Sequence, residues 1–161
     1  CMSGGINEPR DGIALTAWAL LTHPEALAAC RADAAFWRPA CEELFRWISP
    51  VATATRQTTR DVELADTQIP AGAMVAGVIS SANRDERRFT NPDVYDLHRK
   101  EGPHIAFSTG AHVCLGAWLG RSTVRVAVQR LFERLPDLAL AGPVEIKGFE
   151  FRGPTALPIG W

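Results

Sequence analysis

The ten residues from Phe107 to Gly116 read Phe-Ser-Thr-Gly-Ala-His-Val-Cys-Leu-Gly and place one thiol, Cys114, just before a long amphipathic segment. At a helix N-terminus, the dipole and the unpaired N–H groups favour a thiolate. Gly110 and Gly116 suit a turn with positive φ and a flat partner close to the backbone. His112 can donate a hydrogen bond to an anionic group of that partner. A thiolate with an anion-binding group beside it is typical of haem iron ligation.

Two other interpretations of this loop are available. In one, Cys114 is an inert buried thiol in a glycine-rich turn. In the other, His112 and Cys114 bind zinc, but two ligands would leave half of a tetrahedral site empty. The chemistry of the loop therefore favours haem.

The spacing Phe-x-x-Gly-x-His-x-Cys-x-Gly resembles the cysteine loop of the cytochrome P-450 (haem-thiolate monooxygenase) family. The resemblance implies that haem b is bound with Cys114 as the metal ligand. It also implies that the four other patterned residues surround the cofactor, namely Phe107, Gly110, His112 and Gly116. Arg56, five residues before Asp61, matches the family's propionate-binding arginine, although an ordinary surface arginine is the alternative.

The first residues resemble the family's distal helix, which crosses the haem face opposite the thiolate. Gly4 to Glu8 stand where the family pattern is Ala-Gly-x-acid-Thr. The resemblance implies that Gly5 opens a groove for dioxygen. Asn7 replaces the acid and Glu8 replaces the alcohol of the proton relay, so the usual relay is altered. In the alternative interpretation, Asn7 only caps a helix that begins at Pro9.

Glu43 and Arg46 are three residues apart, so they share one face of a predicted helix. On a surface, such a pair contributes only ~0.2–0.5 kcal/mol. The resemblance implies instead that Arg99 joins them in a buried triad, which supports the fold and does no chemistry. Losing one partner of such a triad would cost ~3–5 kcal/mol.

Length and composition are those of one globular domain: 161 residues, 47% apolar, 22% charged and a net charge of −1. The balanced charge argues against nucleic acid as a partner. The longest apolar run, residues 12–22, is about half the ~20 residues of a membrane helix, and no secretory signal is visible. Four cysteines without metal-knuckle spacing favour a reducing cytoplasm.

The expected fold is mainly α with small β-sheets (α+β). Residues 3–11 are expected to lead into an apolar helix that ends before His23, and further helices are predicted over 24–32, 39–48 and 115–135, with strands over 52–56, 61–64, 67–69 and 73–79. The resemblance implies in addition a short helix over 82–85 and terminal strands over 138–141, 144–151 and 156–158. This order matches the C-terminal part of the family fold: distal helix, Glu-x-x-Arg helix, meander, cysteine loop, proximal helix and terminal strands. Because Cys1 comes first and family domains are longer, residues 1–161 are interpreted as the C-terminal haem-binding portion of a single domain, without its N-terminal portion.

The activity implied by the resemblance is a monooxygenase that activates dioxygen and oxidises an apolar small molecule. Two electrons would come from NAD(P)H through an electron-donor protein or a fused reductase. Arg121 and Arg125 are candidates for docking an acidic donor, or belong to a solvated face. Ala52 and Ala54, with Phe149 or Phe151, are candidates for facing the substrate.

Two alternatives to this activity stay open. One is a peroxide-using or isomerising haem-thiolate enzyme, suggested by Glu8 at the position of an alcohol. The other is a truncated, non-enzymatic fragment that holds no haem.

Overall fold

The computed structural model describes residues 4–161, so Cys1 and Ser3 lie outside the described residues. Four helices of at least nine residues form the body: α1 (Asn7–Thr22), α2 (Pro24–Ala32), α3 (Trp37–Trp47) and α5 (Ala117–Arg134). Shorter helical turns are η1 (Ala34–Phe36), α4 (Ile79–Ala82) and η2 (Gly110–His112). The mainly helical fold with small sheets is as predicted.

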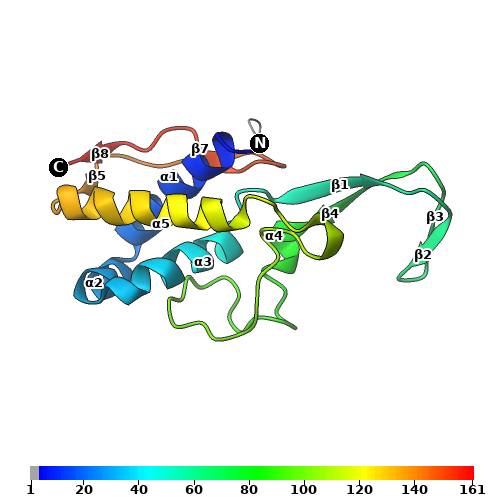
Figure 1. The fold of residues 1–161 in the computed structure, drawn as a ribbon, viewed down its shortest axis with the longest axis horizontal. Coiled ribbons are helices and arrows are strands. Elements are labelled where there is room, and N and C mark those ends of the chain that lie inside the picture. The colour runs from blue at the N-terminus through cyan, green and yellow to red at the C-terminus, as the bar shows by residue number, and fades with distance from the viewer. Residues whose placement is uncertain (1–3) are drawn as a thin grey trace.

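Helices α1, α3 and α5 pack against one another around the core (Figure 1). Leu15 and Leu20 of α1, Leu44 of α3, and Val124 and Val128 of α5 are fully or almost fully buried there. Gly12 lets α1 approach α5 closely: a Cβ at this position would lie 3.0 Å from a methyl of Val124. This contact brings the beginning of α1 near the beginning of α5, where the site lies.

Four two-stranded antiparallel sheets accompany the helices. Strand β1 (Thr53–Gln57) pairs with β4 (Met74–Val78), and β2 (Val62–Leu64) with β3 (Thr67–Ile69). Near the C-terminus, β5 (Ala139–Leu140) pairs with β8 (Ile159–Gly160), and β6 (Ile146–Lys147) with β7 (Gly153–Pro154). Strands β1 and β4 form a ribbon that carries the β2–β3 hairpin away from the helical body (Figure 1).

The terminal strands differ from their prediction. Strand β6 covers two residues instead of the expected 144–151, and β8 follows residues 156–158 instead of coinciding with them. Short helix α4 also ends where residues 82–85 were expected to begin one. Such short elements depend on their partners in space more than on local periodicity.

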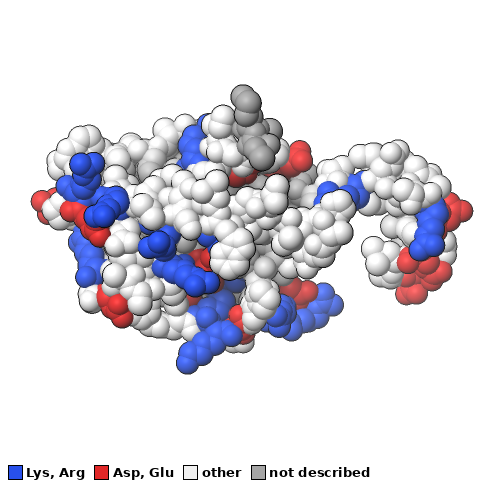
Figure 2. Space-filling model, in the orientation of Figure 1, with Lys and Arg blue, Asp and Glu red and all other residues white. Residues whose placement is uncertain are grey.

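Within residues 4–161, no single helix is long and apolar enough to cross a membrane. Helices α1 and α2 together meet that criterion by length and composition alone, but they are bent by 104° relative to each other. On the face shown in Figure 2, Lys and Arg side chains alternate with Asp and Glu over the body, so no large patch of one sign forms there.

Candidate functional site

A cavity of about 380 Å³ lies between the beginning of α1, the end of α3, strand β1 and the cysteine loop, defined as residues 107–116. Its volume is in the range of small-molecule and cofactor sites, roughly 300–1,000 Å³. The residues around it are mostly apolar or glycine, and the predicted site residues among them are Gly5, Glu8, Arg56, Phe107, His112, Cys114 and Gly116. Segments far apart in the sequence therefore meet at one cavity.

The cysteine loop is held by its own backbone. The Cys114 N–H donates to the Phe107 carbonyl at 2.8 Å, and the Ala117 N–H, at the beginning of α5, donates to the Cys114 carbonyl at 3.1 Å. Gly110 has φ +62°, a left-handed conformation that favours glycine. The loop therefore presents the exposed thiol of Cys114 just before helix α5.

The two glycines of the loop, Gly110 and Gly116, were predicted to share one role, but the structure gives them different ones. Gly116 has φ −84° and precedes α5 as its N-cap, so positive φ is not its reason. A Cβ at Gly116 would lie 3.9 Å from the Cys114 Sγ, which is ordinary contact. The second left-handed residue of the loop is Ser108, with φ 61°, which the sequence did not reveal. Gly110 does not line the cavity.

The cysteines differ sharply in environment. Burial raises the pKa of Cys30 to about 11 and that of Cys41 to about 12, so both thiols stay protonated and unreactive. Cys114 is exposed and lines the cavity. Among the described cysteines, Cys114 is thus the one available to a ligand.

At the other end of the cavity, Gly5 and Glu8 line the wall. The Glu8 Oε2 atom is buried and has no hydrogen-bond partner within the described part of the chain. Asn7 is exposed and does not line the cavity. The capping alternative is wrong, because α1 already includes Asn7, and Ile6, which precedes the helix, makes no side-chain cap.

Arg56 and His112, the candidate donors of hydrogen bonds to an anionic group, both line the cavity. Arg56 is exposed on β1, and its guanidinium donates to the Thr55 carbonyl at 2.8 Å. Ala54 lines the cavity as expected, whereas Ala52 is buried and does not. Phe149 and Phe151 do not line it either: they are 80% and 50% exposed, and Phe151 forms a β-bridge with Val51.

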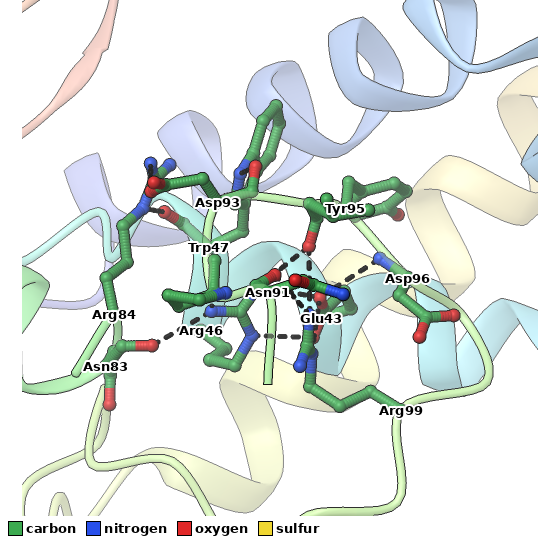
Figure 3. Close-up of polar contacts among 12 residues, drawn as sticks. Glu43, Arg46, Trp47, Asn83, Arg84, Asn91, Asp93, Tyr95, Asp96 and Arg99 are labelled. Carbon is green, nitrogen blue, oxygen red and sulfur yellow. Dashed lines mark hydrogen bonds and ion pairs between the residues drawn. The ribbon is translucent and has the colours of Figure 1, made fainter. Parts of the chain in front are cut away.

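Apart from the cavity, Glu43 and Arg46 of α3 lie in contact with Arg99 (Figure 3). The Glu43 carboxylate accepts hydrogen bonds from Arg46 Nη2 at 2.7 Å and Nε at 2.8 Å, and from Arg99 Nε at 3.0 Å. All three side chains are at most 7% exposed. The Asp96 N–H also donates to Glu43, at 3.0 Å.

The remaining donors of this network reach backbone carbonyls. Arg46 donates to the carbonyls of Asn83, Pro92 and Val94 at 2.8–3.1 Å. Arg99 donates to those of Thr90, Asn91 and Val94 at 2.7–3.2 Å. The network thus ties helix α3 to residues 83–99, the segment preceding the cysteine loop.

A second charged cluster was missed by sequence reasoning. Glu42, next to Glu43, accepts hydrogen bonds from Arg121 at 2.7 Å and His104 at 3.1 Å. Burial opposes the ionisation of Glu42, but the hydrogen bonds from His104 and Arg121, together with the charges of these two side chains, outweigh it and leave the pKa of Glu42 below the usual 4.5. Arg121 is therefore tied to α3 and is not a free cation of a solvated face. Two adjacent acids in the predicted helix were the signal that one of them needed another partner.

The residues of the cavity fit a haem group. They supply an exposed thiol, two side chains able to donate to anions, apolar walls and an unpartnered carboxylate oxygen. The zinc alternative finds no support, because residues 4–161 contain no group of three or more His, Cys, Asp or Glu that could hold a metal ion.

Comparison with known proteins agrees with this site. The sequence matches the model of the family described as "Cytochrome P450" over residues 19–136. It is 44% identical over 149 residues to the cytochrome P450 monooxygenase PikC of Streptomyces venezuelae, covering 89% of this chain and 36% of that protein. It is 41% identical over 165 residues to nocardicin C N-oxygenase of Nocardia uniformis, covering 98% and 41%.

Solved structures lead to the same family. HmtN, a hydroxylase involved in himastatin biosynthesis, superposes with a TM-score of 0.93 at 37% identity, covering 98% of this chain and 44% of that one. P450BioI, in complex with a fatty-acid-ligated acyl carrier protein, gives 0.91 at 35% identity, covering 97% and 41%. The chain spans 36–41% of the length of the first curated relatives it matches. With two thirds or more of its own residues inside these matches, the chain belongs to the cytochrome P450 family.

Proposed function

We propose that the full-length protein is a haem-thiolate monooxygenase and that residues 1–161 are the C-terminal haem-binding portion of its single catalytic domain. The observation that carries this proposal is the meeting of Glu8, Arg56, His112 and Cys114 at one cavity. Its support from outside the chain is membership of a family whose matched members include named monooxygenases.

In this proposal, the chain binds haem b through three kinds of contact: a metal ligand, hydrogen bonds to the propionates and an apolar wall. Cys114 supplies the thiolate ligand, and Arg56 and His112 donate hydrogen bonds to the propionates. Phe107 and Gly116 form the wall beside the thiol, while Gly110 shapes the turn that presents it. When bound, thiolate-ligated haem supplies the electron donation that favours cleavage of the O–O bond.

Glu8 is the proposed proton carrier of the opposite wall. Its buried Oε2 atom has no hydrogen-bond partner among residues 4–161, so it is free to hold or pass a proton at that atom. Gly5, which lacks a side chain, leaves space beside it. Asn7 is exposed, so we assign it no direct role in the cavity.

The proposed substrate is an apolar small molecule, consistent with the mostly apolar wall. The fatty acid carried by the acyl carrier protein in the P450BioI complex supports the same class. Two electrons would come from NAD(P)H by way of an electron-donor protein or a fused reductase. We place the enzyme in the cytoplasm, where its thiols stay reduced.

One observation favours a second function. A carboxylate instead of an alcohol, unpartnered in the cavity wall, suits an enzyme that uses peroxide directly, because Glu8 can take the proton of the peroxide as a general base. Turnover with peroxide alone, compared with turnover with NADPH and a donor protein, separates the two.

The decisive test is the carbon monoxide difference spectrum of the reduced full-length protein. The wild type should show the red-shifted Soret band of thiolate ligation, and Cys114→Ser should abolish it. Cys41→Ser is the matched control, since Cys41 is buried away from the cavity, and should keep the band in whatever protein folds. Retention of the band in Cys114→Ser would refute the assignment.

A further inference from the structure

The Glu42 cluster joins three segments that are distant in sequence. Glu42 lies on α3, Arg121 on α5, and His104 in the loop three residues before Phe107. The side chains of Glu42 and Arg121 are both 28% exposed, and that of His104 is 10% exposed. The cluster is thus partly shielded from water, where charge-assisted hydrogen bonds are stronger than on an open surface.

The same cluster encloses the ring of Phe107. The Arg121 guanidinium lies over the ring at 4.0 Å from its centroid, within the range of a cation–π contact. The His104 ring is 6.2 Å away, and the Phe45 ring meets it edge-on at 5.0 Å. A Cβ at Gly120 would lie 3.8 Å from the Phe107 ring, so helix α5 closes a further side.

Phe107 in turn holds Cys114, because its carbonyl accepts the Cys114 N–H at 2.8 Å. The path from Glu42 through Arg121 and Phe107 to Cys114 therefore consists of direct contacts. Phe107 lines the cavity, whereas Glu42 and Arg121 do not, so the contacts of these two can influence a ligand bound at the thiol only through Phe107.

We propose that Glu42, His104 and Arg121 are positioning residues that clamp Phe107, and through it fix the geometry and the electrostatic environment of the Cys114 thiolate. This inference rests on the proposed function, since it assigns the clamp to the haem ligand. It also assigns Arg121 a role within this portion of the protein, through its partly buried contacts with Glu42 and Phe107.

The charges of the clamp make the proposal distinguishable from simple structural support. A cation near the thiolate favours the reduced haem, because it attracts the added electron, and a carboxylate opposes reduction. Removing Arg121 and removing Glu42 should therefore shift the reduction potential in opposite directions. If the variants acted only by loosening the packing, the two substitutions would not shift the reduction potential in opposite directions.

The experiment compares Arg121→Gln, Glu42→Gln and the double variant in the full-length holoenzyme. We expect Arg121→Gln to lower the potential, Glu42→Gln to raise it, and the double variant to lie between them, because its net charge equals that of the wild type. Haem loss to an excess of apomyoglobin should be about tenfold faster in each single variant, the lower end of the effect of residues that orient metal ligands. Arg121→Lys, which keeps the charge, should restore the potential.

The matched control is Arg130→Gln on the same helix. Arg130 pairs with Glu133, and their side chains are 73% and 40% exposed, so this variant should leave the potential and the rate of haem loss unchanged. Unchanged potentials in both single variants, or shifts of the same sign, would overturn the clamp. If Arg121→Gln fails to fold, Glu42→Gln decides: a raised potential supports the clamp and an unchanged one overturns it. A wild type without the thiolate band would overturn the proposed function and the clamp with it. A wild type that shows the band, with variants whose reduction potentials are unchanged, would overturn the clamp alone.

Discussion

The region around Glu43 and the cavity around Cys114 contrast in how far they are satisfied within the chain. Every charge of the Glu43 network has partners among residues 4–161, and its side chains are at most 7% exposed. At the cavity, by contrast, Glu8 carries an oxygen without a hydrogen-bond partner among residues 4–161, and the side chain of Leu119 in the cavity wall is 73% exposed. The charges of the Glu43 network are satisfied within the described residues, whereas the cavity wall leaves polar and apolar groups available to a ligand.

This difference separates support from chemistry. A carboxylate held between two guanidinium groups is expensive to bury and is retained only with all its hydrogen bonds in place. It therefore holds residues 83–99 against α3 and leaves no atom free for a reaction. Unsatisfied groups are costly too, so their presence at the cavity points to binding. Changes in the first region should thus cost stability, and changes in the second should cost ligand binding or turnover.

The largest expected effect is that of Glu43→Gln on stability. Two buried guanidinium groups would lose their carboxylate, which should lower the free energy of unfolding by about 3–5 kcal/mol. Denaturant unfolding of the full-length protein measures it. Glu133→Gln, which breaks an exposed pair on α5, should cost no more than about 0.5 kcal/mol. Equal midpoints for Glu43→Gln and the wild type would remove the contrast between the two regions.

Next come Arg56→Ala and His112→Ala, which should weaken haem binding with little change in protein stability. A charge-assisted hydrogen bond contributes about 1.5–3 kcal/mol, so each variant should lose haem about tenfold faster or more. Transfer of haem to apomyoglobin gives the rate, and the thiolate band of the haem that stays bound should persist. Arg60→Ala, exposed beyond the same strand and outside the cavity wall, is the control. Unchanged rates in both variants would contradict the propionate assignment.

A smaller effect is expected from Glu8→Gln, which keeps the shape of the side chain but cannot carry a proton. The hydrogen peroxide released per electron consumed should rise by about twofold or more, far below the ~10²-fold effect of a lost general acid, because water can partly replace it. Glu8→Thr should release less peroxide per electron than Glu8→Gln, and the control Glu25→Gln, at an exposed position on α2, should release as much as the wild type. If Glu8→Gln released no more peroxide per electron than the wild type, Glu8 would not be the proton carrier.

The smallest effect concerns the pH dependence contributed by Glu42, which lies between the two regions. Its pKa in the folded protein is lowered below the usual 4.5. Its stabilising contribution is therefore fully present above the unfolded-state pKa and is lost as the pH falls through the folded-state value. The difference in unfolding free energy between the wild type and Glu42→Gln should shrink from about pH 6 to about pH 3. A difference that stays constant over this range would contradict the hydrogen-bonded arrangement of Glu42.

Local features were predictable where the chain itself determines them. Helix α2 covers Pro24–Ala32 as predicted, because Pro24 begins it and Asp33 follows in an extended conformation. The β2–β3 hairpin agrees to within one residue, since its strands adjoin a two-residue turn, Ala65 and Asp66, both with positive φ. The thiol-presenting loop could likewise be recognised, because a contiguous stretch carries its glycines, its histidine and its cysteine.

By itself, then, the sequence determined the elements whose causes lie within a few residues: the helices, the hairpin and the loop that carries Cys114. Only the tertiary structure decided that Glu42 pairs with Arg121, 79 residues away, that one oxygen of Glu8 has no partner among the described residues, and that the terminal strands are only two residues long. The physical reason is that hydrogen bonds between distant segments form only when packing removes the competing water. Periodicity predicts which face of a helix is buried, but not which charged side chain of a neighbouring helix lies opposite it.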